Sequence, residues 1–284
     1  MNFIEMSIPS HQKKKKRSFV ISSQRSGLNF LRVCIESLTG QRTPGKTLLI
    51  EAGPDNPAIF FRTHDAAQIS QNNAAVWRGI DAQTAQGRKI VLLIRNPFEI
   101  FGRELKNSDR SKAVWALEVY ASNLNHFCTL ENCTKSHFYY EDFTADPQHM
   151  IKLIEFMDID NADGQRVTRD ILMREWDRVQ EIGRNLYDIN QKKQGGCMSR
   201  NARDKMSFHQ SILSKSDNQT VIRFLDETVS AAGKTILDRY ISSIKHPKKT
   251  LTNRVCLTIS SLFNLNSMIR KNSRNNRSKP AKSN

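Results

Sequence analysis

Residues 89 to 97 read Lys-Ile-Val-Leu-Leu-Ile-Arg-Asn-Pro, and this short stretch gives the strongest indication of fold class in the sequence. Its apolar run from Ile90 to Ile94 is unbroken, which is typical of a parallel strand covered on both faces. Pro97 follows at a position that is favoured in the first turn of a helix. The stretch therefore predicts a buried parallel strand over residues 89–94 and a helix directly after it.

A second unit of this kind is predicted upstream. Phe19, Val20 and Ile21 form a short apolar strand, and apolar residues at helical spacing follow over residues 28–38. Gly40 then supplies a helix C-cap. This part of the chain is predicted to be a strand, a tight turn and a helix.

The remaining segments continue the alternation. Further strands are expected at residues 47–50, 58–62 and 137–140, with a turn at 53–57. Helices are expected at residues 113–127, after an Asp146-Pro147 start, and at 217–232 with Gly233 as the terminator. Strands that alternate with helices predict an α/β fold with a central parallel sheet and helices on both faces.

The net charge of +16 is concentrated at the two ends of the chain. Residues 1–17 carry +4 and residues 245–284 carry +10, which leaves +2 for the segment between them. A nucleic-acid-binding domain is expected to carry its basic patch on the folded body, so no specific nucleic-acid partner is expected. The distribution predicts a basic N-terminal tail at 1–17, one domain at 18–245 and a basic extension at 246–284, disordered from about residue 270.

The two basic ends leave several interpretations open. The lysine run at 13–17 is typical of a nuclear-import signal, a heparin patch or a solvated tail. Residues 255–269 carry no charge and place apolar residues on one helical face, which suits either a membrane surface or packing against the body. Peripheral contact with a membrane or a polyanion through these ends is therefore one expected kind of partner.

Other classes of protein are disfavoured by what the sequence lacks. No window approaches the roughly 18 apolar residues of a membrane-spanning helix, and the first residues do not have the pattern of an export signal. The five cysteines are odd in number and include no CxxC pair, which favours reduced thiols and argues against zinc. A soluble, cytoplasmic protein is expected, and its oligomeric state stays open.

The residues that carry chemistry follow the ends of the predicted strands. The first group, Gln24 to Phe30, reads Gln-Arg-Ser-Gly-Leu-Asn-Phe and joins the first strand to the first helix. Free N–H groups at a helix N-terminus, a glycine that permits close approach and an arginine together suit a phosphate or sulfate dianion. An ordinary strand-to-helix connection is the alternative, and the spacing of a Walker A loop is absent.

Two further groups place a histidine and an arginine at strand ends. His64 follows the strand expected at 58–62, and Arg95 follows the strand at 89–94. Open parallel sheets bind ligands beyond the carboxyl ends of their strands, so both side chains are expected to face the same crevice as Arg25. The alternatives are a histidine hydrogen-bonded at a strand end and an arginine in an internal salt bridge.

Residues 138–143, Phe-Tyr-Tyr-Glu-Asp-Phe, complete an ordered series of four motifs. The series resembles that of the sulfotransferases that use 3'-phosphoadenosine-5'-phosphosulfate (PAPS) as sulfuryl donor, over about residues 18–160, and the first loop resembles the form found in carbohydrate sulfotransferases. The resemblance implies a three-layer α/β/α sulfotransferase fold, like that of P-loop NTPases. It also implies PAPS as donor, no metal, and a hydroxyl or amine acceptor, either a small molecule or a glycan such as a carbohydrate or glycolipid.

The resemblance further implies roles for individual residues. Arg25 and His64 are the expected catalytic residues, with Arg25 stabilising the leaving phosphate and His64 acting as general base. The residues expected to hold the donor are Arg25, Ser26, Gly27, Leu28, Asn29 and Phe30 in the first loop, Arg95 and Arg103 at the 3'-phosphate, and Tyr140. Arg103 stands where the family usually has a serine, and its guanidinium is expected to make that contact. Asp65 is expected either to orient the imidazole or to cap a helix.

Lys192 and Lys193 are candidates for a last phosphate clamp on a late loop that continues to Lys205 and Phe208, with a solvated loop as the alternative. Two other classes of function stay open. One is a relative of the P-loop kinases, which the missing Walker lysine disfavours. The other is a non-catalytic protein that binds a polyanion or a membrane and has a decayed nucleotide site.

Overall fold

The computed structural model describes residues 16–54, 56–70, 78–194 and 213–245. The chain divides into two compact units, Met1–Asp238 and Arg239–Asn284. The first unit contains the sheet and every candidate site residue. Of the second unit, only the end of helix α10 (Ala231–Lys245) is described. The domain boundaries expected from charge, at residues 17 and 245, stay predictions.

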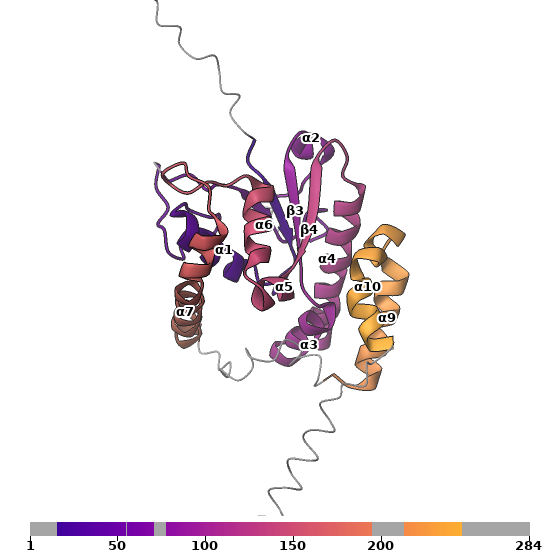
Figure 1. Ribbon diagram of the computed structural model, residues 1–284. Helices are drawn as coiled ribbons and strands as arrows, with labels where there is room; N and C mark the ends of the chain where they lie inside the picture. Colours follow the sequence, from indigo (N-terminus) through magenta and orange to yellow (C-terminus); the bar gives the residue numbers. More distant parts are fainter. Residues whose placement is uncertain (1–15, 55, 71–77, 195–212, 246–284) are drawn as a thin grey trace, which may run out of the picture. The chain divides into compact units, whose positions relative to one another are not determined.

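Four strands form one parallel sheet in the order β2-β1-β3-β4 (Figure 1). They are β1 (Phe19–Ser22), β2 (Phe61–Thr63), β3 (Lys89–Ile94) and β4 (Thr134–Tyr139). Each strand that follows another in the chain is separated from it by at least one helix or a long connection, as parallel pairing requires. The prediction of an α/β fold with a parallel sheet is confirmed.

Helices connect and flank these strands. They are α1 (Leu28–Thr39), α2 (Ala82–Ala85), α3 (Pro97–Asn107), α4 (Arg110–Thr129), α5 (Tyr140–Ala145), α6 (Gln148–Met157), α7 (Arg169–Gln194) and α9 (Lys215–Thr228). Two predicted signals work as expected. Pro97 occupies the first turn of α3, and Gly40 ends α1 in the left-handed conformation with φ 65°.

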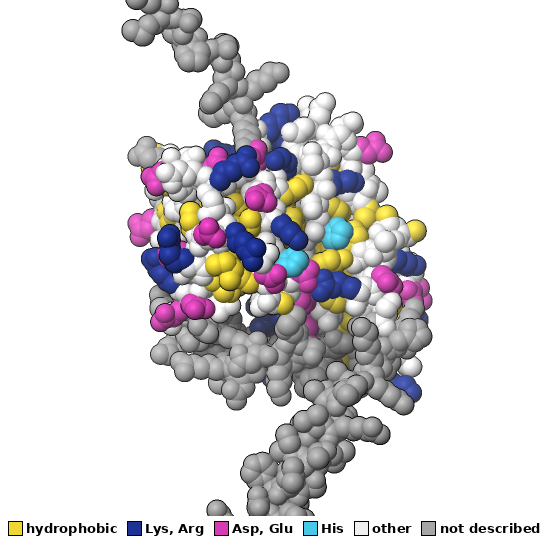
Figure 2. Space-filling view, viewed as in Figure 1, with side chains coloured by type: hydrophobic (Ala, Val, Ile, Leu, Met, Phe, Trp, Pro, Cys, Tyr) yellow, Lys and Arg dark blue, Asp and Glu magenta, His cyan; other side chains and the backbone are white. Residues whose placement is uncertain are grey.

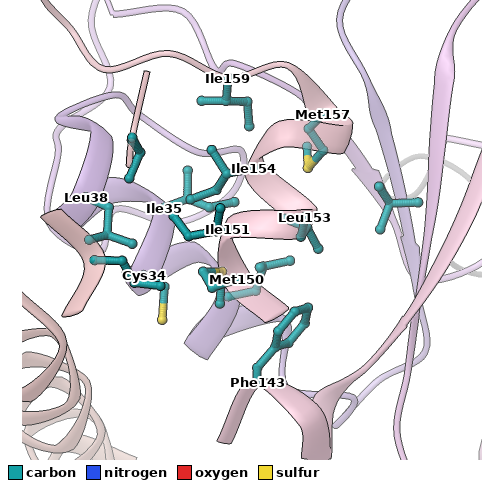
Figure 3. Close-up of a cluster of buried hydrophobic side chains, with 14 of the residues drawn as sticks. Cys34, Ile35, Leu38, Phe143, Met150, Ile151, Leu153, Ile154, Met157 and Ile159 are labelled. Atoms are coloured by element: carbon teal, nitrogen blue, oxygen red, sulfur yellow. The ribbon is translucent and has the colours of Figure 1, made fainter. Parts of the chain in front are cut away.

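The side chains of the two central strands, β1 and β3, are buried on both faces of the sheet. Val20, Val91 and Leu93 belong to an apolar cluster with α1 and α6, of which Figure 3 shows the helix side chains. The intervening residues Ile21 and Leu92 are buried as well. Helix α6 contacts β3 and helix α4 contacts β1. The unbroken apolar run of β3 is therefore explained by cover for both sets of its side chains.

The strands all end at one edge of the sheet. In the pairing register Ile21 lies opposite Thr63, Ser22 opposite Leu93, and Ile94 opposite Tyr139. Strand β1 lies between β2 and β3. The chain continues from β1 to β2 on one side and from β3 to β4 on the other, so the connections after the adjacent strands β1 and β3 diverge at one point. In open α/β sheets this point forms the crevice that binds ligands.

Three sequence expectations were wrong in detail. Residues 47–50 do not form a strand, because the N–H groups of Leu49 and Ile50 donate to the buried carboxylate of Glu36 instead of to a neighbouring strand. The strand expected at 58–62 is instead β2, at Phe61–Thr63, where Phe61 pairs with Phe19. The helix expected at 217–232 is two helices, α9 and α10.

The break between α9 and α10 falls at Val229 and Ser230, before the glycine that was expected to end the helix. Gly233 lies inside the first turn of α10, where a Cβ atom would approach Val229 Cγ1 to 2.6 Å. This glycine is therefore required by close packing rather than by a helix terminus.

The expected start of α6 is nearly right, because the Asp146 carboxylate accepts from the N–H of Gln148 at 2.9 Å.

Within the described ranges, no helix combines the length and the apolar character that crossing a membrane requires. On the face drawn in Figure 2, Lys and Arg side chains are interleaved with Asp and Glu side chains. This agrees with a body whose positive and negative charges nearly balance. The proposed membrane-surface segment at 255–269 and the lysines at 13–15 lie outside the described residues.

Candidate functional site

The loop between β1 and α1 has the backbone shape of an anion cradle. Arg25 (φ 64°) and Gly27 (φ 91°) both adopt left-handed conformations, and the Ser26 hydroxyl donates to the Ser23 carbonyl at 2.6 Å. Gly27 is the N-cap of α1 and provides no side-chain cap. The first N–H groups of a helix have no acceptor inside the helix, so those of α1 are open to a ligand.

Gly27 is also required by its neighbour Tyr140, the first residue of α5. A Cβ atom at position 27 would lie 2.0 Å from Tyr140 Cδ2. The tyrosine ring therefore packs directly on the backbone of the loop. The glycine serves both the left-handed backbone and this close approach.

Arg25 is held by an acidic residue that the sequence motifs did not indicate. Its Nε atom donates to Oε1 of Glu104 at 2.8 Å, and the arginine side chain is 50% exposed whereas Glu104 is 10% exposed. Among the described residues, no acceptor bonds to the two Nη groups of Arg25, which stay available for a ligand. A signal was present in the sequence, because Glu104 lies one helical turn after Ile100 on the buried face of α3.

Arg95 joins the same loop from the end of β3. Its Nη1 group donates to the carbonyl of Arg25 at 3.1 Å, and its guanidinium lies over the Tyr140 ring, 4.6 Å from the centroid. The Nε atom is buried without a hydrogen-bond partner in the described structure. No described carboxylate pairs with Arg95, so the alternative of an internal salt bridge finds no support.

Aromatic side chains continue from Tyr140 along α1. Phe30 meets Tyr140 edge to face with centroids 6.0 Å apart, and it meets Trp176 of α7 in the same way at 6.2 Å. Such contacts fix ring orientation. The residue after Tyr140 ties the strand ends together, because Oε1 of Glu141 accepts from the N–H of Asn96 at 2.9 Å.

His64 lies at the end of β2 with its ring turned toward the end of β1. Its Nδ1 atom is 2.7 Å from the carbonyl oxygen of Ser22. A carbonyl only accepts, so Nδ1 carries the proton and Nε2 carries the lone pair. Nη1 of Arg62 donates to Nε2 at 3.3 Å. Burial, opposed by the Ser22 hydrogen bond, lowers the pKa of His64 to about 4, so the ring is neutral near pH 7.

Asp65 has a local role in the turn after His64. Its carboxylate oxygens accept from the N–H groups of Ile69 and Ser70, at 3.0 and 2.7 Å. The segment after Asp65 is a turn and not a helix, so the expectation that Asp65 caps a helix is wrong. The main chain of His64 is held separately, because the side-chain amide of Asn123 donates to the His64 carbonyl at 2.8 Å.

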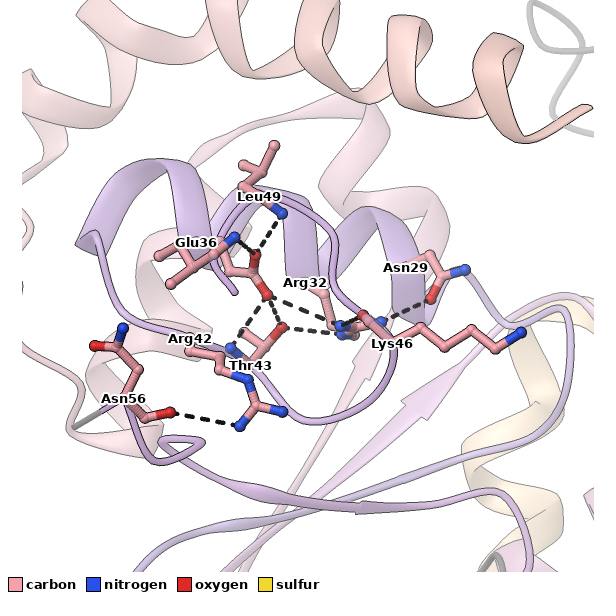
Figure 4. A network of polar contacts seen from close by, with 9 residues as sticks. Asn29, Arg32, Glu36, Arg42, Thr43, Lys46, Leu49 and Asn56 are labelled. Atoms are coloured by element: carbon pink, nitrogen blue, oxygen red, sulfur yellow. Dashed lines mark hydrogen bonds and ion pairs between the residues drawn. The ribbon is translucent and has the colours of Figure 1, made fainter. Parts of the chain in front are cut away.

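The other predicted donor-binding residues of the first loop have different orientations. Ser26 and Leu28 are buried, so their side chains are not exposed for contact with a ligand. The Asn29 side-chain oxygen accepts from Arg32 Nη1 at 3.4 Å, which leaves the Asn29 NH2 group as a donor (Figure 4). Arg103 lies in α3, half-buried and next to Glu104.

Lys192 and Lys193 lie in the last turn of α7, so the loop expected for them is wrong. Their side chains are outside the described part of the structure, as are Lys205 and Phe208. The structure therefore brings Arg25, Gly27, Phe30, Arg95 and Tyr140 together and places His64 at the adjacent strand end. A role for the two lysines stays a prediction.

Comparisons with known proteins add little to this geometry. No protein-family model and no curated protein sequence matches the chain. Among solved structures, the sulfotransferase domain from the Synechococcus PCC 7002 olefin synthase is similar over 55% of this chain and 78% of that chain, with a TM-score of 0.37 and 14% sequence identity. A similarity at this level supports no argument about function, so the function is inferred from the residues of the site alone.

Proposed function

We propose that this protein is a sulfotransferase, which transfers a sulfuryl group from PAPS to a hydroxyl or amine acceptor, on a three-layer α/β/α fold of the sulfotransferase kind. One observation carries the proposal. An open helix N-terminus with two arginines, Arg25 and Arg95, adjoins a neutral histidine whose Nε2 atom carries a lone pair. This combination provides an anion cradle and a base at one edge of a parallel sheet.

The residues present fit a donor with several negative charges. Arg25 offers two Nη groups, α1 offers its first N–H groups, and Arg95 has a buried Nε without a partner in the described structure. Charge-assisted hydrogen bonds of this kind are the usual means of holding phosphate and sulfate groups. Phe30 and Tyr140 supply aromatic surface beside the cradle, where a purine base is proposed to pack.

Sulfuryl transfer requires a base for the acceptor and stabilisation of the leaving phosphate. His64 Nε2 takes the proton of the acceptor hydroxyl while a new bond forms between that oxygen and sulfur. The bond between sulfur and the phosphate oxygen breaks at the same time, and no electrons are exchanged with a further reagent. Arg25 and the N–H groups of α1 stabilise the charge that develops on the phosphate oxygen.

The hydrogen bond from His64 Nδ1 to the Ser22 carbonyl supports this role. It keeps the proton on Nδ1 and fixes the ring orientation, so Nε2 remains the basic atom. A pKa near 4 keeps the base unprotonated at neutral pH, although it also makes the base weak. Binding of an anionic donor nearby is expected to raise this pKa.

The proposal is tested by thermal unfolding with adenosine 3',5'-bisphosphate, with adenosine 5'-monophosphate and ATP as controls and no added metal. At 100 times its dissociation constant a ligand adds about 2.7 kcal/mol to the free energy of unfolding. We expect a shift of several degrees with the bisphosphate and a smaller one with the controls. Release of bisphosphate from PAPS in the presence of an acceptor then measures the transfer itself.

Other outcomes of this experiment identify the two alternative classes. A larger shift with ATP than with the bisphosphate, strengthened by Mg²⁺, would indicate a relative of the P-loop kinases. A cooperative transition that no nucleotide moves would indicate a decayed site. In that case binding to heparin or anionic vesicles, lost when residues 1–17 and 246–284 are deleted, would indicate a binding protein.

A further inference from the structure

A second cationic group lies beside the candidate base, on the β2 side of the crevice. The Arg62 guanidinium at the end of β2 is half-buried and donates from Nη1 to His64 Nε2 at 3.3 Å. Its Nη2 atom lies against the loop after α1, where a Cβ atom at Gly45 would come within 2.7 Å of it. Burial lowers the pKa of Arg62, because a half-buried charge is poorly solvated.

The carboxylate that bonds this loop, Glu36, already has its partners. Glu36 is buried in α1 and accepts hydrogen bonds from the N–H groups of Thr43, Leu49 and Ile50, and it pairs with Arg32 (Figure 4). Burial is the main cause that lowers the pKa of Arg32 to about 10, with the charge of Arg62 as the next cause. Two guanidiniums therefore share the surroundings of one carboxylate that is fully committed to Arg32 and the loop.

Arg62 consequently has a surplus positive charge at the crevice. Across the described ranges, no carboxylate forms an ion pair with Arg62. The neighbouring Arg42 donates to the Asn56 carbonyl at 3.5 Å. This contact does not neutralise the positive charge of Arg62. A half-buried guanidinium whose contact is a neutral imidazole is suited to binding an anion.

This charge is separate from the cradle proposed for the donor. Arg25 and Arg95 contact each other through the loop after β1 and lie toward β3, whereas Arg62 lies on β2, at the far side of β1. His64 contacts Arg62 through Nε2 and the Ser22 carbonyl at the end of β1 through Nδ1. An anion bound at Arg62 would therefore belong to the molecule that approaches His64 from the β2 side.

The contact between Arg62 and His64 also has to be exchanged during the reaction. Nε2 accepts from Arg62 in the structure, so it can accept from an acceptor hydroxyl only when Arg62 moves to another acceptor. We propose that the acceptor itself carries a carboxylate, phosphate or sulfate close to the hydroxyl that is modified, and that Arg62 binds this group. The inference rests on the proposed function, because it concerns the acceptor of the same site.

The test uses two acceptors that differ only in the anionic group, p-nitrophenyl β-D-glucuronide and p-nitrophenyl β-D-glucoside. We expect the wild-type protein to bind the glucuronide at least tenfold more tightly, by calorimetry without nucleotide and again with saturating adenosine 3',5'-bisphosphate. In Arg62→Gln the preference should fall to about one, and in Arg62→Lys most of it should remain. Arg42→Gln, a neighbouring arginine that bonds a carbonyl, is the matched control and should keep it.

Several results would overturn the inference. These are equal binding of the two glycosides, a preference that survives in Arg62→Gln, and failure to bind of both the glucuronide and glucose 6-phosphate, the latter added as a sugar that carries a phosphate. An equal loss of turnover for both acceptors in Arg62→Gln would place Arg62 on the transferred group instead. Binding of adenosine 3',5'-bisphosphate, measured in the same proteins, distinguishes failure of this inference from failure of the proposed function. In the proposed function, bisphosphate binding depends on Arg25 and Arg95 and not on Arg62. An Arg62-dependent preference without bisphosphate binding would overturn the donor assignment only.

Discussion

Arg25 and Glu104, 79 positions apart in the sequence, form an ion pair in which the arginine Nε lies 2.8 Å from the carboxylate Oε1. The contact uses Nε and neither of the two Nη groups. Glu104 therefore fixes the direction of Arg25 and leaves its paired donors for an anion. Glu104 also places a negative charge next to the proposed binding site. It therefore orients Arg25 toward an anion, while its own charge weakens the attraction of the site for that anion.

Replacing Glu104 with glutamine separates these two effects. The glutamine oxygen can still accept from Arg25 Nε, whereas the negative charge is removed. We expect adenosine 3',5'-bisphosphate to bind roughly threefold more tightly, by calorimetry at low salt. Glu118→Gln, at an exposed position of α4, is the control and should leave the affinity unchanged. Weaker binding in Glu104→Gln would mean that the charge of Glu104 is needed to hold Arg25 in place.

Gly27→Ala is expected to be strongly destabilising. The added Cβ atom would stand 2.0 Å from the Tyr140 ring, on a backbone with φ 91°. Two other glycines separate these causes, because Gly164 (φ 76°) has open space and Gly53 has open space without a positive φ. Gly164→Ala should lower the free energy of unfolding by about 1–2 kcal/mol and Gly53→Ala by less than about 0.5 kcal/mol.

Gly27→Ala should therefore lower stability more than Gly164→Ala does, as chemical denaturation can measure. In the double variant with Tyr140→Ala, the part that comes from the ring should be recovered and the part from the backbone should persist. If Tyr140→Ala restored nothing, the packing of the ring on the loop would not be the cause.

Arg95→Ala is expected to abolish discrimination between two nucleotides. If Arg95 holds the 3'-phosphate, the bisphosphate should lose about 10- to 100-fold in affinity and adenosine 5'-monophosphate much less. Because Arg95 also donates to the Arg25 carbonyl, a general loosening of the loop would weaken both nucleotides alike. Arg110→Ala, which removes an exposed pair with Asp217, is the control for loss of a surface arginine. Retained discrimination would exclude Arg95 from the 3'-phosphate.

The lowered pKa of His64 predicts a dependence of stability on pH. The native state binds this proton only near pH 4, whereas the unfolded state binds it near pH 6.5. The unfolded state therefore binds more protons between these values, so the free energy of unfolding should fall as pH is lowered from about 6.5 to 4, by roughly 3 kcal/mol for this group. The difference between wild type and His64→Gln isolates it from other groups. Equal slopes in both proteins would contradict the buried neutral state.

The Glu36 network predicts a large structural effect away from the reacting groups. Glu36→Gln leaves Arg32 buried without its partner and should lower the free energy of unfolding by roughly 3–5 kcal/mol. The double variant Arg32→Met, Glu36→Leu should lose less than the sum of its single variants. Glu155→Gln, at an exposed position of α6, should change stability by less than about 0.5 kcal/mol. A neutral effect of Glu36→Gln would mean that the loop at 43–50 does not depend on this carboxylate.

The elements predicted well are those whose signal is local. Strand 89–94 agrees with β3 at both ends, because its residues are apolar throughout and its end is marked by Pro97. Residues 47–50 look equally suited to a strand, but the N–H groups of Leu49 and Ile50 instead bond Glu36, 13 and 14 positions earlier. No pattern within the segment contains that information, because the partner is a buried side chain of another element.

The same difference separates the site residues. Arg25, His64, Arg95 and Tyr140 each follow a strand, and parallel strands end at one edge, so their placement along that edge could be predicted. Glu104 could not be assigned to Arg25, nor Arg62 to His64, because each pairing depends on side-chain direction in the folded chain. The role of each residue in catalysis remains a prediction that the variants above test.

The contacts that assemble the crevice join distant parts of the chain. Ser22 meets His64 across 42 positions, Arg25 meets Arg95 across 70, and Tyr140 completes the loop from still further on. Contacts between residues so far apart in the sequence raise the contact order and are expected to slow folding. During synthesis the cradle therefore stays incomplete until β4 has emerged, although β1 is made first. Recovery of nucleotide binding would accordingly report the last stage of refolding.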